Sequence, residues 1–165
     1  MASTALLMGQ LWAGGIASAE GINLSWNDCG AHGADVDSDA CTSNIGTAFV
    51  LIGSFFPPPG IIEFIGMNAE IEIRTQSTTL PDWWKHGSAT CRGTTALSPS
   101  IDFSSELFGC IDPYSGQGGI ALTYSIGFYG PNSARLSLHA DTAPVELTEG
   151  LEFYAFKVTL SRTRV

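Results

Sequence analysis

The sequence predicts an all-β protein: a single antiparallel β-sandwich of the immunoglobulin-like or jelly-roll-like sort. Several runs alternate apolar and polar residues with a period of two, which is typical of strands with one buried face. Many of the 19 glycines and eight prolines lie between these runs and mark turns. No stretch of helical length has apolar residues at i, i+3, i+4 and i+7. A chain of 165 residues is long enough for one domain with a real core.

Residues 1–19 predict a cleaved export signal. They carry no charge, and Ala17-Ser18-Ala19 before Glu20 fits the small-x-small pattern of a signal-peptidase site. The Lys or Arg that usually opens such a signal is missing, so the alternative is an ordinary apolar strand or helix. We expect export, with residues 20–165 as the sandwich domain. No later apolar run is long enough to span a membrane.

The strands are expected, in chain order, at residues Ile22–Trp26, 49–56, 69–74, 121–128, 135–140 and 154–161. The run 49–56 is apolar nearly throughout, which predicts a central strand buried on both sides. The sequence PPPG at 57–60 cannot continue a sheet interior, because three successive N–H donors are missing. Residues 130–133, GPNS, separate two alternating runs and predict a hairpin turn.

One short helical turn is expected near residues 80–86. It contains two adjacent tryptophans, Trp83 and Trp84, which cannot share one face of a helix or strand. An exposed tryptophan beside Asp82 and His86 would form a sugar-stacking platform with a polar rim. The alternative is a cap over one open end of the sandwich, with both rings in the core.

The four cysteines, Cys29, Cys41, Cys91 and Cys110, predict two structural disulfides in an oxidising compartment. Three pairings are possible, and the chain-local one joins Cys29 to Cys41 and Cys91 to Cys110. A zinc site is the alternative, but C-x₂₋₄-C spacing is absent.

Calcium is the one cofactor for which the sequence holds a candidate site. Asp35, Asp37 and Asp39 form a D-x-D-x-D pattern whose carboxylates a turning loop can direct at one hard cation. An EF-hand loop would also carry Gly at its sixth position and Glu at its twelfth, and here Ala40 and Gly46 stand there. The alternative is a solvated acidic loop.

The net charge of the chain and the catalytic motifs that it lacks limit the classes of function that the sequence allows. The net charge is −9, and residues 1–73 contain no Lys or Arg, so a basic nucleic-acid-binding face is not expected. The chain has no H-x-x-x-H zinc signature and no G-x-S-x-G elbow. A hydrolase on a sandwich scaffold would have to draw a carboxylate pair from Glu63, Glu70, Glu72 and Glu106. We assign no catalytic residue.

Several segments together resemble a group of uncharacterised exported bacterial proteins that keep them in this order. These segments are SWNDCG at 25–30, FPP at 56–58, LPDWWKHG at 80–87 followed by Cys91-Arg92, and EFYAFK at 152–157. The resemblance implies an exported bacterial β-rich domain with paired cysteines. It implies no catalytic residue.

The sequence therefore favours an exported non-enzymatic structural or adhesive module, such as a subunit of an extracellular fibre or surface assembly. A strand at Ile22–Trp26 or 153–162 would pair with the open edge of a neighbouring subunit. One alternative is a glycan-binding module that uses Trp83 or Trp84, with calcium at 35–39. A hydrolase is the third hypothesis, since sandwiches host all three functions.

Overall fold

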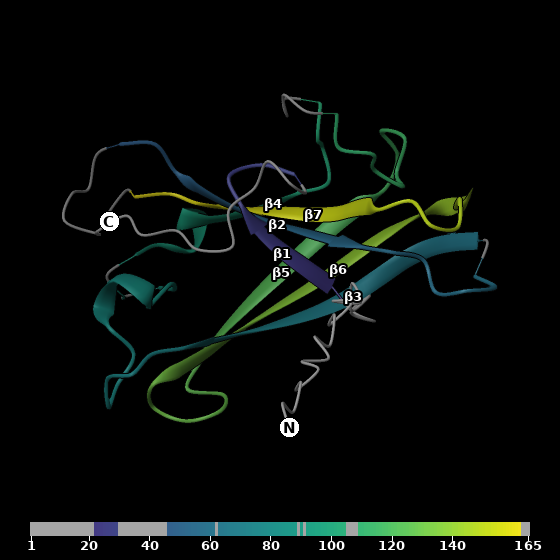
Figure 1. The fold of residues 1–165 in the computed structure, drawn as a ribbon. Helices are drawn as coiled ribbons and strands as arrows, with labels where there is room; N and C mark the ends of the chain where they lie inside the picture. Colours follow the sequence, from purple (N-terminus) through teal and green to yellow (C-terminus); the bar gives the residue numbers. More distant parts are fainter. Residues whose placement is uncertain are drawn as a thin grey trace, which may run out of the picture.

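The computed structural model describes residues 22–29, 46–61, 63–88, 90, 92–104 and 109–162. Two antiparallel sheets form a sandwich, which confirms the predicted fold class (Figure 1). The four-stranded sheet has the order β1-β2-β7-β4 and the three-stranded sheet the order β3-β6-β5. The strands are β1 (Ile22–Trp26), β2 (Phe49–Phe55), β3 (Glu63–Arg74), β4 (Leu97–Ser100), β5 (Gly119–Ile126), β6 (Ser133–Glu146) and β7 (Phe153–Leu160).

Strand β7 is one of the two interior strands of the four-stranded sheet. It pairs with β2 on one side and with β4 on the other. Ala155, Phe156 and Val158 on this strand are fully buried. The prediction that residues 153–162 offer an edge to a neighbouring subunit is therefore wrong, because both edges of β7 are already paired. Strand β2 is interior, as predicted, and lies between β1 and β7.

The three-stranded sheet is built around the long strand β6, which pairs with β3 and β5. The turn predicted at residues 130–133 lies in the β5–β6 connection. Strand β3 begins earlier than the alternation predicts, because a bulge between Phe64 and Gly66 interrupts the pattern. Gly66 has a φ of 147°, and a Cβ there would lie 2.4 Å from the Ala140 carbonyl oxygen. Only glycine fits this close approach.

The main core lies between the sheets, where Leu136 and Leu138 of β6 meet Phe156 and Val158 of β7. The arrangement of four plus three strands is that of an immunoglobulin constant domain, but the connectivity differs. In that fold the fifth strand belongs to the four-stranded sheet and the seventh to the three-stranded one. Here β5 and β7 have exchanged these places.

The predicted helical turn is the 3-10 turn η2 (Asp82–Trp84). A second 3-10 turn, η3 (Thr94–Ala96), leads into β4, and neither η3 nor β4 was expected. In the described part of the chain, no helix has the length and apolar character needed to cross a membrane.

A disulfide joins Cys29 to Cys110, with the two Cα atoms 5.9 Å apart. The predicted local pairing of Cys29 with Cys41 and of Cys91 with Cys110 is therefore wrong. The bridge links residues 81 positions apart, because the fold brings the segment around Cys110 against the end of β1. Cys41 and Cys91 lie outside the described residues.

Candidate functional site

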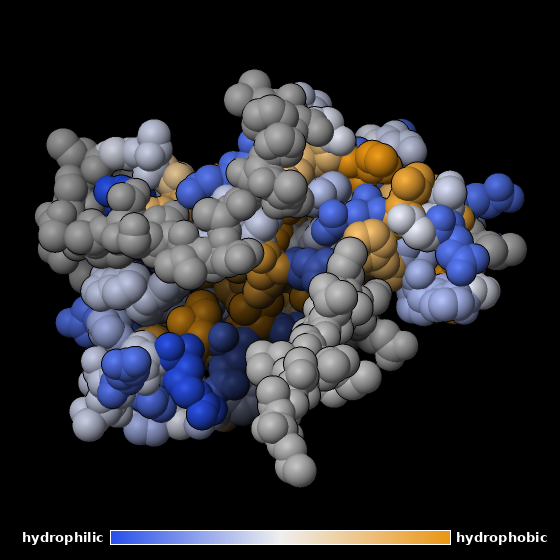
Figure 2. Space-filling view, viewed as in Figure 1, coloured by the Kyte–Doolittle hydropathy of each residue, from blue (hydrophilic) through white to orange (hydrophobic). Residues whose placement is uncertain are grey.

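A groove of about 330 Å³ opens between the two sheets, on the side where β1 and β3 are the edge strands. Its size is in the range of ligand-binding pockets. Figure 2 shows apolar surface in the hollow between the sheets. The lining is almost entirely apolar and consists of Leu24, Trp26, Leu51, Ile71, Ile73, Trp84, Leu97, Leu136, Val158 and Leu160.

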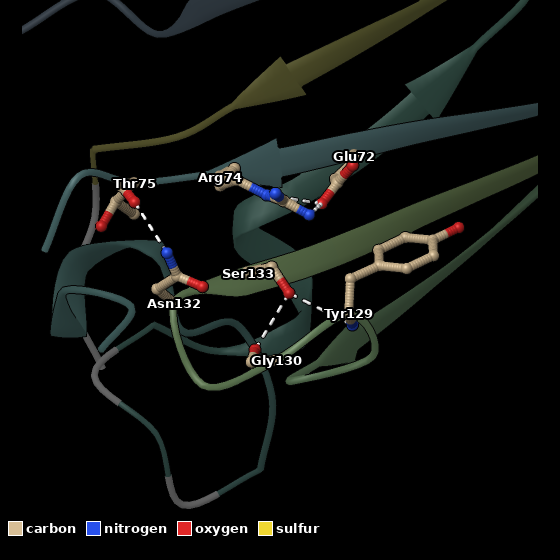
Figure 3. Close-up of polar contacts among 7 residues, drawn as sticks. All are labelled: Glu72, Arg74, Thr75, Tyr129, Gly130, Asn132 and Ser133. Atoms are coloured by element: carbon tan, nitrogen blue, oxygen red, sulfur yellow. Dashed lines mark hydrogen bonds and ion pairs between the residues drawn. The ribbon is translucent and has the colours of Figure 1, made fainter. Parts of the chain in front are cut away.

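Two charged residues of β3, Glu72 and Arg74, also line the groove. The Arg74 Nε and Nη2 atoms donate hydrogen bonds of 2.9 and 2.5 Å to Glu72 Oε1 (Figure 3). Both side chains are exposed, so this ion pair adds little to stability. Its effect is to keep the rim of the groove polar while the interior stays apolar.

Strand β1 forms one wall of the groove and has an unpaired outer edge among the described residues. Its alternate side chains Ile22, Leu24 and Trp26 point toward the other sheet. Leu24 nevertheless remains 42% exposed, because the groove leaves it partly uncovered. The strand sequence INLSW contains neither a charged residue nor a proline.

The other three sheet edges are protected. Strand β4 carries Pro99, which lacks an N–H donor. Strand β3 has a bulge and several charged residues. On β5, the Tyr124 hydroxyl donates to the Trp84 carbonyl oxygen, and the Tyr124 and His86 rings are 5.2 Å apart. These contacts hold the segment around η2 beside β5. Within the described part of the chain, β1 is the edge that has none of these features.

The end of β1 is held firmly in place. The Asn27 N–H donates to the Val50 carbonyl oxygen at 2.8 Å, and Asn27 adopts a left-handed φ of 68°. The Ser25 hydroxyl donates to the Asp28 carbonyl oxygen, also at 2.8 Å. The disulfide at Cys29 follows directly. These contacts fix the position of β1 against β2 and keep Leu24 and Trp26 at the groove.

The carboxylate of Asp28 lies within 4.8 Å of the sulfur atoms of Cys29 and Cys110. The two sulfur atoms are bonded to each other, so they are not thiolate ligands for a metal ion. Asp28 instead accepts a hydrogen bond of 2.8 Å from the Cys29 backbone N–H. This cluster supports the end of β1 and is not a metal centre.

The predicted aromatic platform lies next to the groove. Trp84 packs against the main core and lines the groove, and Trp83 lies on it with ring centroids 4.7 Å apart. Both tryptophans are half-buried. Asp82 is exposed and forms an ion pair of 2.7 Å with Lys85. The hydrogen bond and positive charge of Lys85 hold the pKa of Asp82 below its usual range.

His86 is only 6% exposed, although it belongs to the same segment. Burial, with a smaller effect from the positive charge of Arg92, lowers the pKa of His86 to about 4. The imidazole is therefore neutral at pH 7. Its Nδ1 atom has no hydrogen-bond partner among the described residues.

Of the remaining predicted residues that the structure describes, only Glu72 lines the groove. Asp35, Asp37 and Asp39 lie outside the described residues, so the calcium site stays a prediction. Of the four carboxylates considered for a hydrolase, Glu70 pairs with Arg135 and Glu72 pairs with Arg74 on the exposed side of β3. Glu106 also lies outside the described residues.

Sequence reasoning missed the groove itself. Alternation correctly placed Ile71 and Ile73 on the apolar face of their strand, but it carries no information about the gap between two sheets. Comparison with protein-family models, curated proteins and solved structures found no match to this chain.

Proposed function

We propose that this protein is an exported structural module that assembles with copies of itself through the edge of β1. The observation that carries the proposal is the contrast among the four sheet edges. Strand β4 carries a proline, β3 has a bulge and charged residues, and the segment around η2 packs against Tyr124 of β5. Among the residues that the structure describes, the edge of β1 has none of these features, and it borders an apolar groove.

A second copy of the chain is the occupant that fits this edge best. Two β1 strands related by a two-fold axis would pair antiparallel and place Leu24 of one copy opposite Leu24 of the other. The exposed part of each Leu24 side chain would then become buried. The strand carries no charge, so no like charges meet across the axis. Ordinary strand addition thus gives both backbone hydrogen bonds and apolar burial.

This pairing uses the same surface on both copies and therefore closes a dimer. A fibre or surface layer would be built from such dimers through a further contact. Strand β1 has five residues, so the contact is small and the dimer is expected to be weak. Export is supported by the signal-like residues 1–19 and by the Cys29–Cys110 disulfide, a bond that persists in oxidising compartments.

Sedimentation equilibrium of oxidised protein comprising residues 20–165 tests the proposal, over roughly 1–500 µM, the range expected for a small interface. The wild type should change from monomer to dimer in this range. Leu24→Lys places a charge where the partner strand would lie and should leave only monomer. The matched control Ser98→Lys adds the same charge to the protected edge strand β4 and should dimerise like the wild type.

Thermal melts and circular dichroism would show that both variants are folded. A wild type that stays monomeric throughout this range contradicts the proposal. So does a folded Leu24→Lys variant that dimerises as well as the wild type. Equal loss of dimer in both lysine variants would point to a general charge effect and would also contradict it.

A further inference from the structure

The outer face of the three-stranded sheet is a second surface with the features of a binding site. Strand register aligns its outward residues in three rows that cross β3, β6 and β5. The rows are Asn68–His139–Ala121, Glu70–Ser137–Thr123 and Glu72–Arg135–Ser125. Successive rows are about 7 Å apart along the strands. A shallow groove of about 290 Å³ runs over the first two rows.

An exposed aromatic pair lies at the end of this face, in the turn between β5 and β6. The Phe128 ring stacks on the guanidinium of Arg135, whose central carbon is 3.5 Å from the ring centroid. The Tyr129 ring meets Phe128 edge-on, with centroids 4.8 Å apart. Phe128 is 51% exposed and Tyr129 is 45% exposed. Large rings this exposed need an explanation, because burying them would stabilise the fold.

Hydrogen bonds tie down the backbone of the turn that carries the two rings. The Ser133 hydroxyl donates to the Gly130 carbonyl oxygen at 2.9 Å and accepts from the Tyr129 N–H at 3.2 Å (Figure 3). The Asn132 side-chain amide donates to the Thr75 carbonyl oxygen at 2.9 Å, which ties the turn to the end of β3. A rigid aromatic surface binds ligands at low cost in conformational entropy.

We propose that this face binds a neutral oligosaccharide. Phe128 and Tyr129 would stack on the apolar faces of sugar rings, and Thr123, Ser137 and Asn68 would hydrogen-bond to sugar hydroxyls. Exposed aromatic rings beside hydroxyl and amide groups match the two kinds of surface that every pyranose presents. The rows extend along the strands, so the site suits a chain of several sugars better than a monosaccharide.

The charges on this face select a neutral ligand. Glu70 pairs with Arg135 at 3.1 Å, and Glu72 pairs with Arg74 at 2.5 Å. The two carboxylates and two guanidinium groups therefore cancel. An acidic polysaccharide would meet two carboxylates without an additional positive charge to bind it. His139 donates through Nδ1 to Asn68 Oδ1 at 2.8 Å, so this hydrogen bond uses the Asn68 carbonyl oxygen and not its amide hydrogens.

Affinity electrophoresis in native gels tests the proposal, with hydroxyethyl cellulose, xylan and galactomannan as neutral probes and polygalacturonate as the acidic probe. The wild type should be retarded by at least one neutral probe and not by polygalacturonate. Phe128→Ala and Tyr129→Ala should each weaken retardation about tenfold. The matched control Trp83→Ala removes a ring from the separate aromatic segment near η2 and should leave retardation unchanged.

Thermal melts should show both turn variants folded, because the two side chains are exposed. Absence of retardation by all three neutral probes overturns the proposal. Retardation that survives in both turn variants but is lost in Trp83→Ala also overturns it and places the sugar on the tryptophans. Strand assembly is tested separately, since Leu24→Lys leaves this face intact.

Discussion

Removal of the Cys29–Cys110 disulfide is expected to lower the free energy of unfolding by about 4 kcal/mol. The bridge closes a loop across a separation of 81 residues. For a loop of this size the chain-entropy relation gives ~4.5 kcal/mol at 25 °C, slightly above the typical value for a native bridge. Cys29 is buried in a cluster with Ile52, Phe103 and Tyr154, so some packing is lost as well.

The change is the double variant Cys29→Ser/Cys110→Ser, compared with the wild type by urea unfolding under oxidising conditions. The urea concentration at the unfolding midpoint should fall strongly. The far-ultraviolet circular dichroism spectrum of the folded variant should remain that of a β protein. Cys41→Ser/Cys91→Ser is the matched control for the loss of two sulfur atoms and should keep the Cys29–Cys110 bridge. If the Cys29→Ser/Cys110→Ser variant loses less than about 1 kcal/mol of unfolding free energy, the bridge does not stabilise the fold as expected.

Peptide mapping tests the pairing directly. Residues 1–73 contain no Lys or Arg, so trypsin alone leaves Cys29 and Cys41 on one peptide. Cleavage before aspartate separates them, because Asp35, Asp37 and Asp39 lie between the two cysteines. After both digestions, the Cys29 peptide should be linked to the Cys110 peptide. A link from Cys29 to Cys41 would refute the pairing.

Three further predictions concern the core. Gly53→Ala should cost about 2 kcal/mol in urea unfolding, because its Cβ would lie 2.2 Å from the Phe156 ring; an unchanged midpoint would contradict this. Tyr114→Phe should cost about 1–2 kcal/mol, because the fully buried hydroxyl donates to the Ala155 carbonyl oxygen at 2.7 Å; a neutral effect would mean that this bond adds no net stability. His86 has its pKa lowered from 6.5 to about 4, so its contribution to stability is complete above pH 6.5 and is lost as the pH falls toward 4. Unfolding midpoints measured from pH 7 to 4 should show this loss in the wild type, and a His86→Gln variant with the same pH slope would refute the assignment.

The strands were predictable from the sequence wherever one face is buried and the other is exposed to solvent. Alternation located β5 and β7 to within two residues, because a period of two is imposed by the backbone itself. It found the first half of β6, but the strand continues to Glu146, beyond the predicted end at residue 140. Strand β4 was missed because it is short and contains Pro99, which argues against a strand except at a sheet edge. The start of β3 was missed because the bulge at Gly66 shifts the register and leaves Ile65 exposed.

The candidate sites were less predictable, because they depend on tertiary packing. The disulfide joins two segments that local sequence gives no reason to pair. Leu24 has the same sequence signal as a fully buried strand residue, yet the gap between the sheets leaves it exposed. Phe128 lies just before a Gly-Pro turn, and its sequence context predicts an ordinary strand residue. Only the fold reveals that its ring stacks on Arg135.

The central position of β7 also constrains the order in which the chain folds. Phe49 lies opposite Leu160, and Phe55 lies opposite Phe153, so β2 finds its second partner only after most of the chain has been made. Pairings so distant in sequence close large loops and form slowly. The β5–β6 hairpin is local and is expected to form first. The four-stranded sheet is expected to form last, so Phe156 and Val158 reach their buried positions only after the end of the chain has been made.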